Sequence, residues 1–300
     1  MANPFFGLPA GQGFAVTSPT VPRRQLLRPY PQFGDILMRQ ATGASNQYHA
    51  FIVKFDKRMT HGWGGRINYT WSSNQNNIFG ELNQFSNNST SVGRILNSYD
   101  VDSEYAHSIT EQPHRLNFAL TGELPFGKGK KHLSDPGIAR ALFGGWAVTG
   151  VGYFQSGFPV AVIQSSNNTG LFSRVQRPNV TGTSPTTDGS TESHYDPGCS
   201  CLINWFNPAA WTTAAPFTFG NAPRTNTDMR TPFKTQTDVA FQKTEPIGGG
   251  ALMIRAEIIN IFNNTQFNGP NMTFGSSSFG RISSTRGFPR LLQIMARFSF

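Results

Sequence analysis

The first segment whose residue types could do chemistry lies between residues 100 and 114. His107, Glu111 and His114 carry imidazole and carboxylate groups that could hold a divalent cation. Three more carboxylates precede them, those of Asp100, Asp102 and Glu104. Pro113 would break any helix that placed both histidines on one face. The pattern therefore favours a solvated extracellular loop over a metal site.

Two other motifs give weaker signals. Residues 126–131, FGKGKK, resemble a phosphate-binding loop but lack the GxxxxGK[ST] pattern, which favours a polar periplasmic turn. Cys199 and Cys201 are the only cysteines; they are too close together to form a disulfide easily and too few for a metal site of their own. No GxSxG motif is present, and neither cysteine has a spaced partner for nucleophilic chemistry. The sequence therefore predicts no enzyme and no cofactor or metal site.

The composition of the 300 residues limits the class of protein. Charged residues make up only 14% of the chain, aromatic residues make up 13%, and the net charge is +9. No stretch approaches the roughly 18 consecutive apolar residues of a membrane helix. This rules out a helical membrane protein but leaves a β-barrel open, since barrel strands bury only alternate residues in lipid. The arginines are dispersed along the chain, so nucleic-acid binding is not predicted.

The N-terminus does not look like an export signal. The sequence contains no Lys or Arg before Arg23, and Pro4 and Pro9 interrupt the segment that would have to be its apolar core. We therefore expect no signal peptide in this chain.

Alternation of apolar and polar residues is the strongest pattern in the sequence. From Trp63 to Trp71 the odd positions are apolar or small and the even positions are small, polar or charged, as in a strand with two different faces. Similar alternation predicts eight strands, at 35–42 (the weakest), 51–56, 63–72, 115–124, 146–156, 235–243, 251–262 and 290–300. The predicted fold is all-β.

The lengths of the links between these strands form a second regularity. Tight links at 58–61 and 246–250 and a moderate link at 125–143 alternate with long ones at 74–111, 157–233 and 263–289; the short link at 43–46 is the exception. Outer-membrane barrels sort their links in this way, with short periplasmic turns and long extracellular loops. The sequence thus predicts an antiparallel up-and-down transmembrane barrel.

Spacing within one strand is consistent with a membrane location. Trp63 and Trp71 share a face, and at about 3.3 Å per residue and about 40° tilt they lie roughly 20 Å apart along the membrane normal. That separation approximates the distance between the two aromatic girdles of a barrel. An ordinary strand with both tryptophans packed in a core would show the same spacing, so that alternative stays open.

Several blocks of the sequence resemble one family in order along the chain. RAEIINIFNNTQFNGP (255–270) and FGRISSTRGFPRLLQIMARFSF (279–300) resemble the C-terminus of TonB-dependent outer-membrane receptors of the Oar-like group. The resemblance implies the C-terminal part of a larger barrel, with about eight of its strands at 35–300 and a leading segment and turn at 1–34. It also implies an outer-membrane location in the full-length receptor.

The resemblance further implies that this chain has partners, some of which are other parts of the same receptor. These parts, absent from this chain, are the plug and the N-terminal barrel strands of the parent receptor, with TonB contacting the receptor only through the plug region. Outer-membrane lipid and the barrel assembly machinery are the remaining implied partners. Phe298 and Phe300, at the end of the last strand, look like the barrel-closure and assembly signal.

The polar face of the strands would line the barrel lumen. Six charged residues are expected there: Arg66, Arg115, Glu123, Arg255, Glu257 and Arg297. They would face a plug or an anionic solute, or simply pair with one another.

Three functions remain open from the sequence. The leading one is part of a receptor that takes up an unidentified solute. The others are a soluble secreted β-sandwich binding module, such as a lectin or adhesin, and an inactive barrel fragment.

Overall fold

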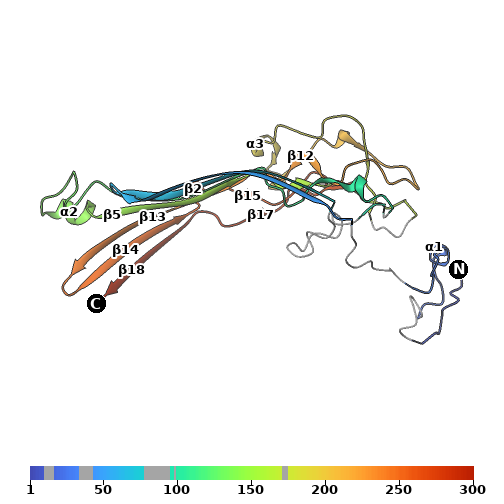
Figure 1. Ribbon diagram of the computed structural model, residues 1–300, viewed down its shortest axis with the longest axis horizontal. Coiled ribbons are helices and arrows are strands. Elements are labelled where there is room, and N and C mark those ends of the chain that lie inside the picture. The colour runs from blue at the N-terminus through green and yellow to red at the C-terminus, as the bar shows by residue number, and fades with distance from the viewer. Residues whose placement is uncertain (10–16, 34–42, 78–94, 98, 171–174) are drawn as a thin grey trace.

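The computed structural model describes residues 1–9, 17–33, 43–77, 95–97, 99–170 and 175–300, and one large antiparallel sheet dominates it (Figure 1). Its strands lie in the order β1-β2-β4-β5-β13-β14-β18, and the short β3 pairs with β2. The bounds are β1 Asn46–Thr60, β2 Trp63–Asn76, β3 Ala106–His107, β4 His114–Glu123, β5 Trp146–Gln155, β13 Lys234–Ile247, β14 Gly250–Ile259 and β18 Leu291–Ser299.

Seven of the predicted strands are confirmed. The structure extends β1, β2 and β13 beyond the predicted ranges, because each continues past the alternating apolar residues into polar ones. The predicted strand at 35–42 lies outside the described residues. The eighth strand of the sheet is instead the two-residue β3, which the sequence pattern did not indicate.

Two tight hairpins set the register of the sheet. His61 and Gly62 join β1 to β2 with φ of 53° and 82°, and positive φ at both central residues is the geometry of a type I′ turn. Gly248 and Gly249 join β13 to β14, with φ of 61° at Gly248. Both turns twist in the sense that antiparallel strands require, so consecutive strands pair directly.

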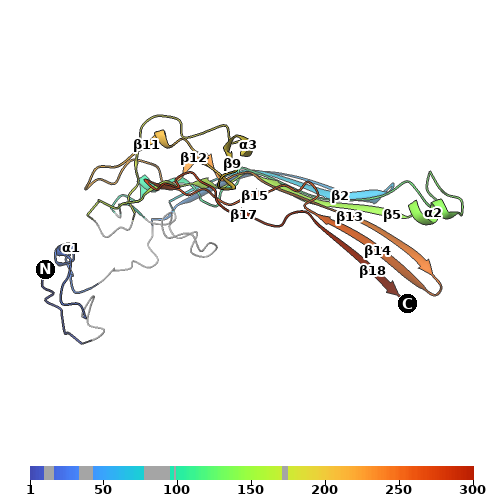
Figure 2. The same ribbon diagram turned by 180° about the vertical axis from the view of Figure 1, so that it is seen from behind.

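The connections are sorted between the two ends of the sheet, as predicted. Both views place α2 (Ile138–Phe143), the two tight turns and the C-terminus at one end, and the long connections at the other (Figures 1 and 2). The three long connections are residues 77–113, 156–233 and 260–290, and we call their described parts the loop domain.

The sheet is open. β1 and β18 are its outermost strands and do not pair with each other, so the described residues form no closed barrel. Within those residues the other sheets are two-stranded, and no second large sheet packs against the first. The structure therefore lacks the two packed sheets of the β-sandwich alternative.

The loop domain contains the hydrophobic core. Trp205, Phe206, Trp211, Met229 and Ile282 are buried there with five smaller apolar residues. Five short strand pairs frame it: β6 Pro159–Val160 with β12 Asn226–Arg230, β7 Ile163–Gln164 with β16 Thr273–Phe274, β8 Asn179–Val180 with β11 Trp211–Thr212, β9 Tyr195–Asp196 with β10 Cys201–Leu202, and β15 Gln266–Phe267 with β17 Thr285–Arg286. The remaining helices are α1 Arg23–Leu26, η2 Asp102–Glu104, α3 Thr191–His194 and η3 Pro208–Ala210.

Candidate functional site

The large sheet has one apolar face, built from alternate residues of its seven long strands. The register places Ile67 opposite Phe118 and Phe118 opposite Gly152, so apolar residues of neighbouring strands share this face. Ten large apolar residues of these strands lie on it: Phe51, Trp63, Ile67, Tyr69, Leu116, Phe118, Val239, Phe241, Leu252 and Ile254. Much of the face is exposed, with Phe51 at 60% and Ile294 at 70%. A contiguous exposed apolar surface of this kind is suited to contact with lipid.

The two tryptophans of β2 lie on this face, Trp63 at the start of the strand and Trp71 past its middle. Trp63 and Trp71 are both exposed, so the alternative in which they pack in a core is wrong. The Lys57 ammonium lies 3.9 Å from the centre of the Trp63 ring and donates hydrogen bonds to the carbonyl oxygens of Thr60 and Trp63. This places an aromatic ring and a cation together at the turn end, as at a membrane interface.

The opposite face of the sheet is polar. Arg66 lies opposite Ala119 on β4, and Arg115 and Glu123 are four residues from Ala119 in either direction, so all three share a face. The register across β5, β13, β14 and β18 puts the other three predicted residues on the same face: Arg255, Glu257 and Arg297. All six charged residues therefore share one face of the sheet. That this face lines a lumen stays a prediction.

The charges on the polar face are partly neutralised within it. Arg66 pairs with Asp56, and Lys130 pairs with Glu123. Arg255 pairs with Glu257 at 2.5 Å and donates a second hydrogen bond to Gln242 at 3.1 Å. Arg115 and Arg297 are exposed, and no ion pair within the described part of the chain involves them.

A polar hollow of about 300 Å³ opens on this face between β2, β4, β5 and β13. Its lining includes Arg66, Tyr153 and Asp238. Asp238 accepts hydrogen bonds from Gln236 and from the backbone N–H of Asn260, at 3.1 and 2.8 Å. Asp238 is not among the residues predicted from the sequence, although the alternation of Val239 and Phe241 on the other face was a signal for it. The hollow presents both charge signs to any solute that reaches it.

A buried ion pair joins separate parts of the loop domain. The Glu104 side chain, 1% exposed, accepts a hydrogen bond from Arg177 at 2.5 Å and one from the backbone N–H of Leu96 at 2.9 Å. Arg224 is also buried and donates to the carbonyl oxygen of Glu104 at 2.9 Å and to the side-chain oxygen of Asn76 at 2.7 Å. Burial lowers the pKa of Arg177, and the Glu104 carboxylate partly offsets this effect. The network fixes the 95–113 connection to both the sheet and the 156–233 connection.

A second buried carboxylate lies nearby. Glu111 accepts hydrogen bonds from Arg230 and His107, each at 2.7 Å, and from the backbone N–H of Asn74 at 3.1 Å. Burial alone would raise the pKa of Glu111, but these hydrogen bonds and the nearby imidazole together hold it below the ordinary value of 4.5. Glu111 is therefore an anchor for the 95–113 connection, tied to the end of β2.

The solvated loop predicted for residues 100–114 is wrong for Glu104 and Glu111, which are buried, whereas Asp100 and Asp102 are exposed. Glu104 and Glu111 are buried because three arginines from distant positions, Arg177, Arg224 and Arg230, fold over them. His114 is turned away from Glu111, with its Nδ1 2.8 Å from the Tyr69 hydroxyl. No group of three metal-ligating side chains occurs among the residues that the structure describes. Nothing local in the sequence identified the three arginines as partners.

The expectation that the two cysteines would not pair is also wrong. Cys199 and Cys201 form a disulfide across one intervening residue, with their Cα atoms 5.2 Å apart. Positive φ at Ser200 lets the chain turn back sharply enough for the two sulfur atoms to meet. The bridge closes a tight loop between β9 and β10.

The link that contains FGKGKK is less polar than predicted. It lies at the short-link end, as expected, but it also contains α2, whose residues Ile138, Leu142 and Phe143 are exposed. Their exposure gives this end of the sheet an apolar surface next to the lysines.

Comparison with known proteins gives one family. The profile of the outer membrane beta barrel domain matches residues 3–293 of the chain. No curated protein and no solved structure matches it. Among the described residues, no helix has the length and apolar character needed to cross a membrane.

Proposed function

Because this chain belongs to the outer membrane beta barrel domain family, we propose that it forms part of the barrel of a TonB-dependent receptor that takes up a solute from outside the cell. The observation that carries the proposal is the two-faced open sheet. Its apolar face suits lipid, its polar face carries dispersed charges, and both edge strands are free to pair with further strands. Transporter barrels of this class have about 22 strands around a plugged lumen, so these strands would supply one sector.

The polar face indicates how such a sector would work. Arg115 and Arg297 would face the plug or an anionic solute, and the hollow beside Arg66 would offer hydrogen bonds to a solute passing over it. The loop domain, fixed by its buried ion pairs, would form the outer surface where the solute first binds. The plug, the remaining strands, TonB and the barrel assembly machinery would be its partners.

Solute depletion tests this proposal. Cells with and without the gene are grown in a defined medium, and the solutes removed are quantified by mass spectrometry with and without a protonophore. We expect at least one solute whose removal needs both the gene and the proton gradient. Gene-dependent removal that persists with the protonophore would indicate a passive pore, and no gene-dependent removal would indicate an inactive barrel fragment.

Placement of the two faces is tested separately in the native membrane. Single cysteines at Asn117 and Phe118 are adjacent in sequence but lie on opposite faces of β4. A water-soluble maleimide should label the residue 117 variant and spare the residue 118 variant. Equal labelling of both would contradict the lipid-facing assignment.

A further inference from the structure

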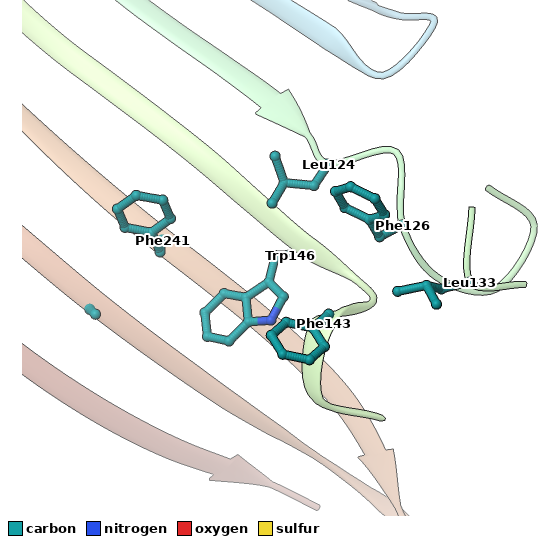
Figure 3. A pocket seen from close by; sticks show the side chains of 7 residues that line it. Leu124, Phe126, Leu133, Phe143, Trp146 and Phe241 are labelled. Carbon is teal, nitrogen blue, oxygen red and sulfur yellow. The ribbon is translucent and has the colours of Figure 1, made fainter. Parts of the chain in front are cut away.

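An apolar pocket of about 480 Å³ lies at the turn end of the sheet (Figure 3). Figure 3 shows Phe126 and Phe143 of the link that contains α2 beside Trp146, with Phe241 on the neighbouring strand β13. The lining residues are Leu124, Phe126, Leu133, Phe143, Trp146, Phe241 and Ala256. Every lining residue is apolar, so the pocket suits a hydrocarbon group rather than a polar solute.

The pocket opens on the apolar face of the sheet. Phe241 lies opposite Val148 and Ala256, and Trp146 is two residues from Val148, so the strand residues of the pocket belong to that face. This is the face that a barrel turns toward lipid. The polar hollow described above is on the other face and is a separate site.

Two hydrogen bonds hold α2 against this face. The indole N–H of Trp146 donates to the carbonyl oxygen of Leu142 at 2.9 Å. The buried ammonium of Lys243 donates to the carbonyl oxygen of Ala141. These bonds leave the other side of α2 exposed, with Ile138 at 81%. The helix is thus fixed in place with apolar residues facing outward.

The link around the pocket is basic. Between residues 124 and 145 there are four Lys or Arg residues and a single acidic one, Asp135; of the four, Lys130 pairs with Glu123 at the end of β4. Lys128 is two residues after Phe126, and Lys131 is two residues before Leu133; both lysines are exposed. The lysines therefore lie in the same link as the residues that line the pocket. An anionic lipid likewise carries its negative phosphate and its apolar acyl chains in one molecule, so it could contact both.

We infer that this pocket binds an acyl chain of an anionic glycerophospholipid in the leaflet nearest the turns, and that Lys128 and Lys131 hold its phosphate. The inference rests on the membrane placement in the proposed function. A second copy of the chain would bring an identical basic link against this one, and like charges oppose such a contact. A lipid supplies both the apolar group and the opposite charge.

Native mass spectrometry of the protein purified from outer membranes in mild detergent tests this inference. The probes are phosphatidylglycerol and phosphatidylcholine with identical acyl chains. The wild-type protein should bind phosphatidylglycerol more tightly. The Lys128→Gln/Lys131→Gln variant should weaken that binding by about fivefold per lysine and leave phosphatidylcholine binding unchanged.

Two further variants separate the contribution of the lysine charges to lipid binding from that of the apolar pocket. Arg286→Gln/Arg290→Gln removes the same charge from exposed positions at the opposite end of the sheet and should bind both lipids as the wild type does. Phe143→Gln changes an exposed pocket residue and should weaken both lipids.

Three outcomes would overturn the inference: equal affinity of the wild type for both lipids, equal loss in the Arg286/Arg290 control, or a protein dimer in place of a lipid complex. Outer-membrane fractionation and heat-modifiable migration of each variant show whether the barrel has assembled. Since lipid binding is measured on purified protein, a failure of solute uptake would not alter its result.

Discussion

Replacing Glu104 by Gln should release the 95–113 connection from the loop domain. The substitution keeps the shape of the side chain but removes the charge that faces the buried Arg177 guanidinium at 2.5 Å. Breaking a buried ion pair by removing one partner costs about 3–5 kcal/mol. We expect the lower end, about 3 kcal/mol, because the amide oxygen of Gln can still accept one hydrogen bond.

Hydrogen exchange with mass spectrometry measures this loss locally. A drop of about 3 kcal/mol in the free energy of local opening corresponds to roughly 150-fold faster exchange. The faster exchange should appear in peptides that cover residues 101–107 and 175–181. Peptides from the β13–β14 hairpin should keep their rates, since they lie at the other end of the sheet.

Two controls define the result. Asp188→Asn removes an exposed carboxylate that faces His194 and should leave exchange at 101–107 unchanged. Glu104→Gln combined with Arg177→Met removes both charges and should recover much of the lost protection, because no buried charge is left alone. Wild-type exchange rates at 101–107 in the Glu104→Gln protein would refute the reasoning.

Three other predictions concern Glu111, the apolar face at Phe118, and Gly152. The pKa of Glu111 is held below 4.5, so the stability that the Glu111 carboxylate contributes is present above pH 4.5 and is lost as the pH falls through the folded-state pKa. Tryptophan fluorescence during acid titration should show this loss of stability. The Glu111→Gln variant should not show it. Phe118→Arg, on the apolar face, should cost about 2–4 kcal/mol and reduce the heat-modifiable fraction in outer membranes, whereas Asn117→Arg, on the polar face, should assemble normally. A Cβ at Gly152 would lie 2.7 Å from the Phe118 ring, so Gly152→Ala should lower the free energy of unfolding measured in urea by about 1–3 kcal/mol. At Gly122 the added Cβ would lie 3.9 Å from the nearest atom, so Gly122→Ala should have little effect.

The sequence alone determined the strands and their two faces. Successive side chains of a strand point to opposite faces, so Trp63 and Trp71, eight residues apart, must lie on the same face of their strand. The same rule assigned Arg66 and Phe118 to opposite faces, and the register confirms it. Glycine at position 62 or 248 and the short links around them likewise marked the hairpins, because turn geometry is set by a few adjacent residues.

The tertiary structure alone decided how the long connections fold. Glu104 is bound by Arg177, 73 residues away, and Asn76 by Arg224, 148 residues away, so no local pattern indicated either contact. Residues 100–114 were for that reason predicted as a solvated loop, although Glu104 and Glu111 are buried. The alternation of apolar and polar residues in a strand can be read from residues two positions apart in the sequence. A buried charge in a loop depends on which distant segment brings the opposite charge, and only the folded chain fixes that choice.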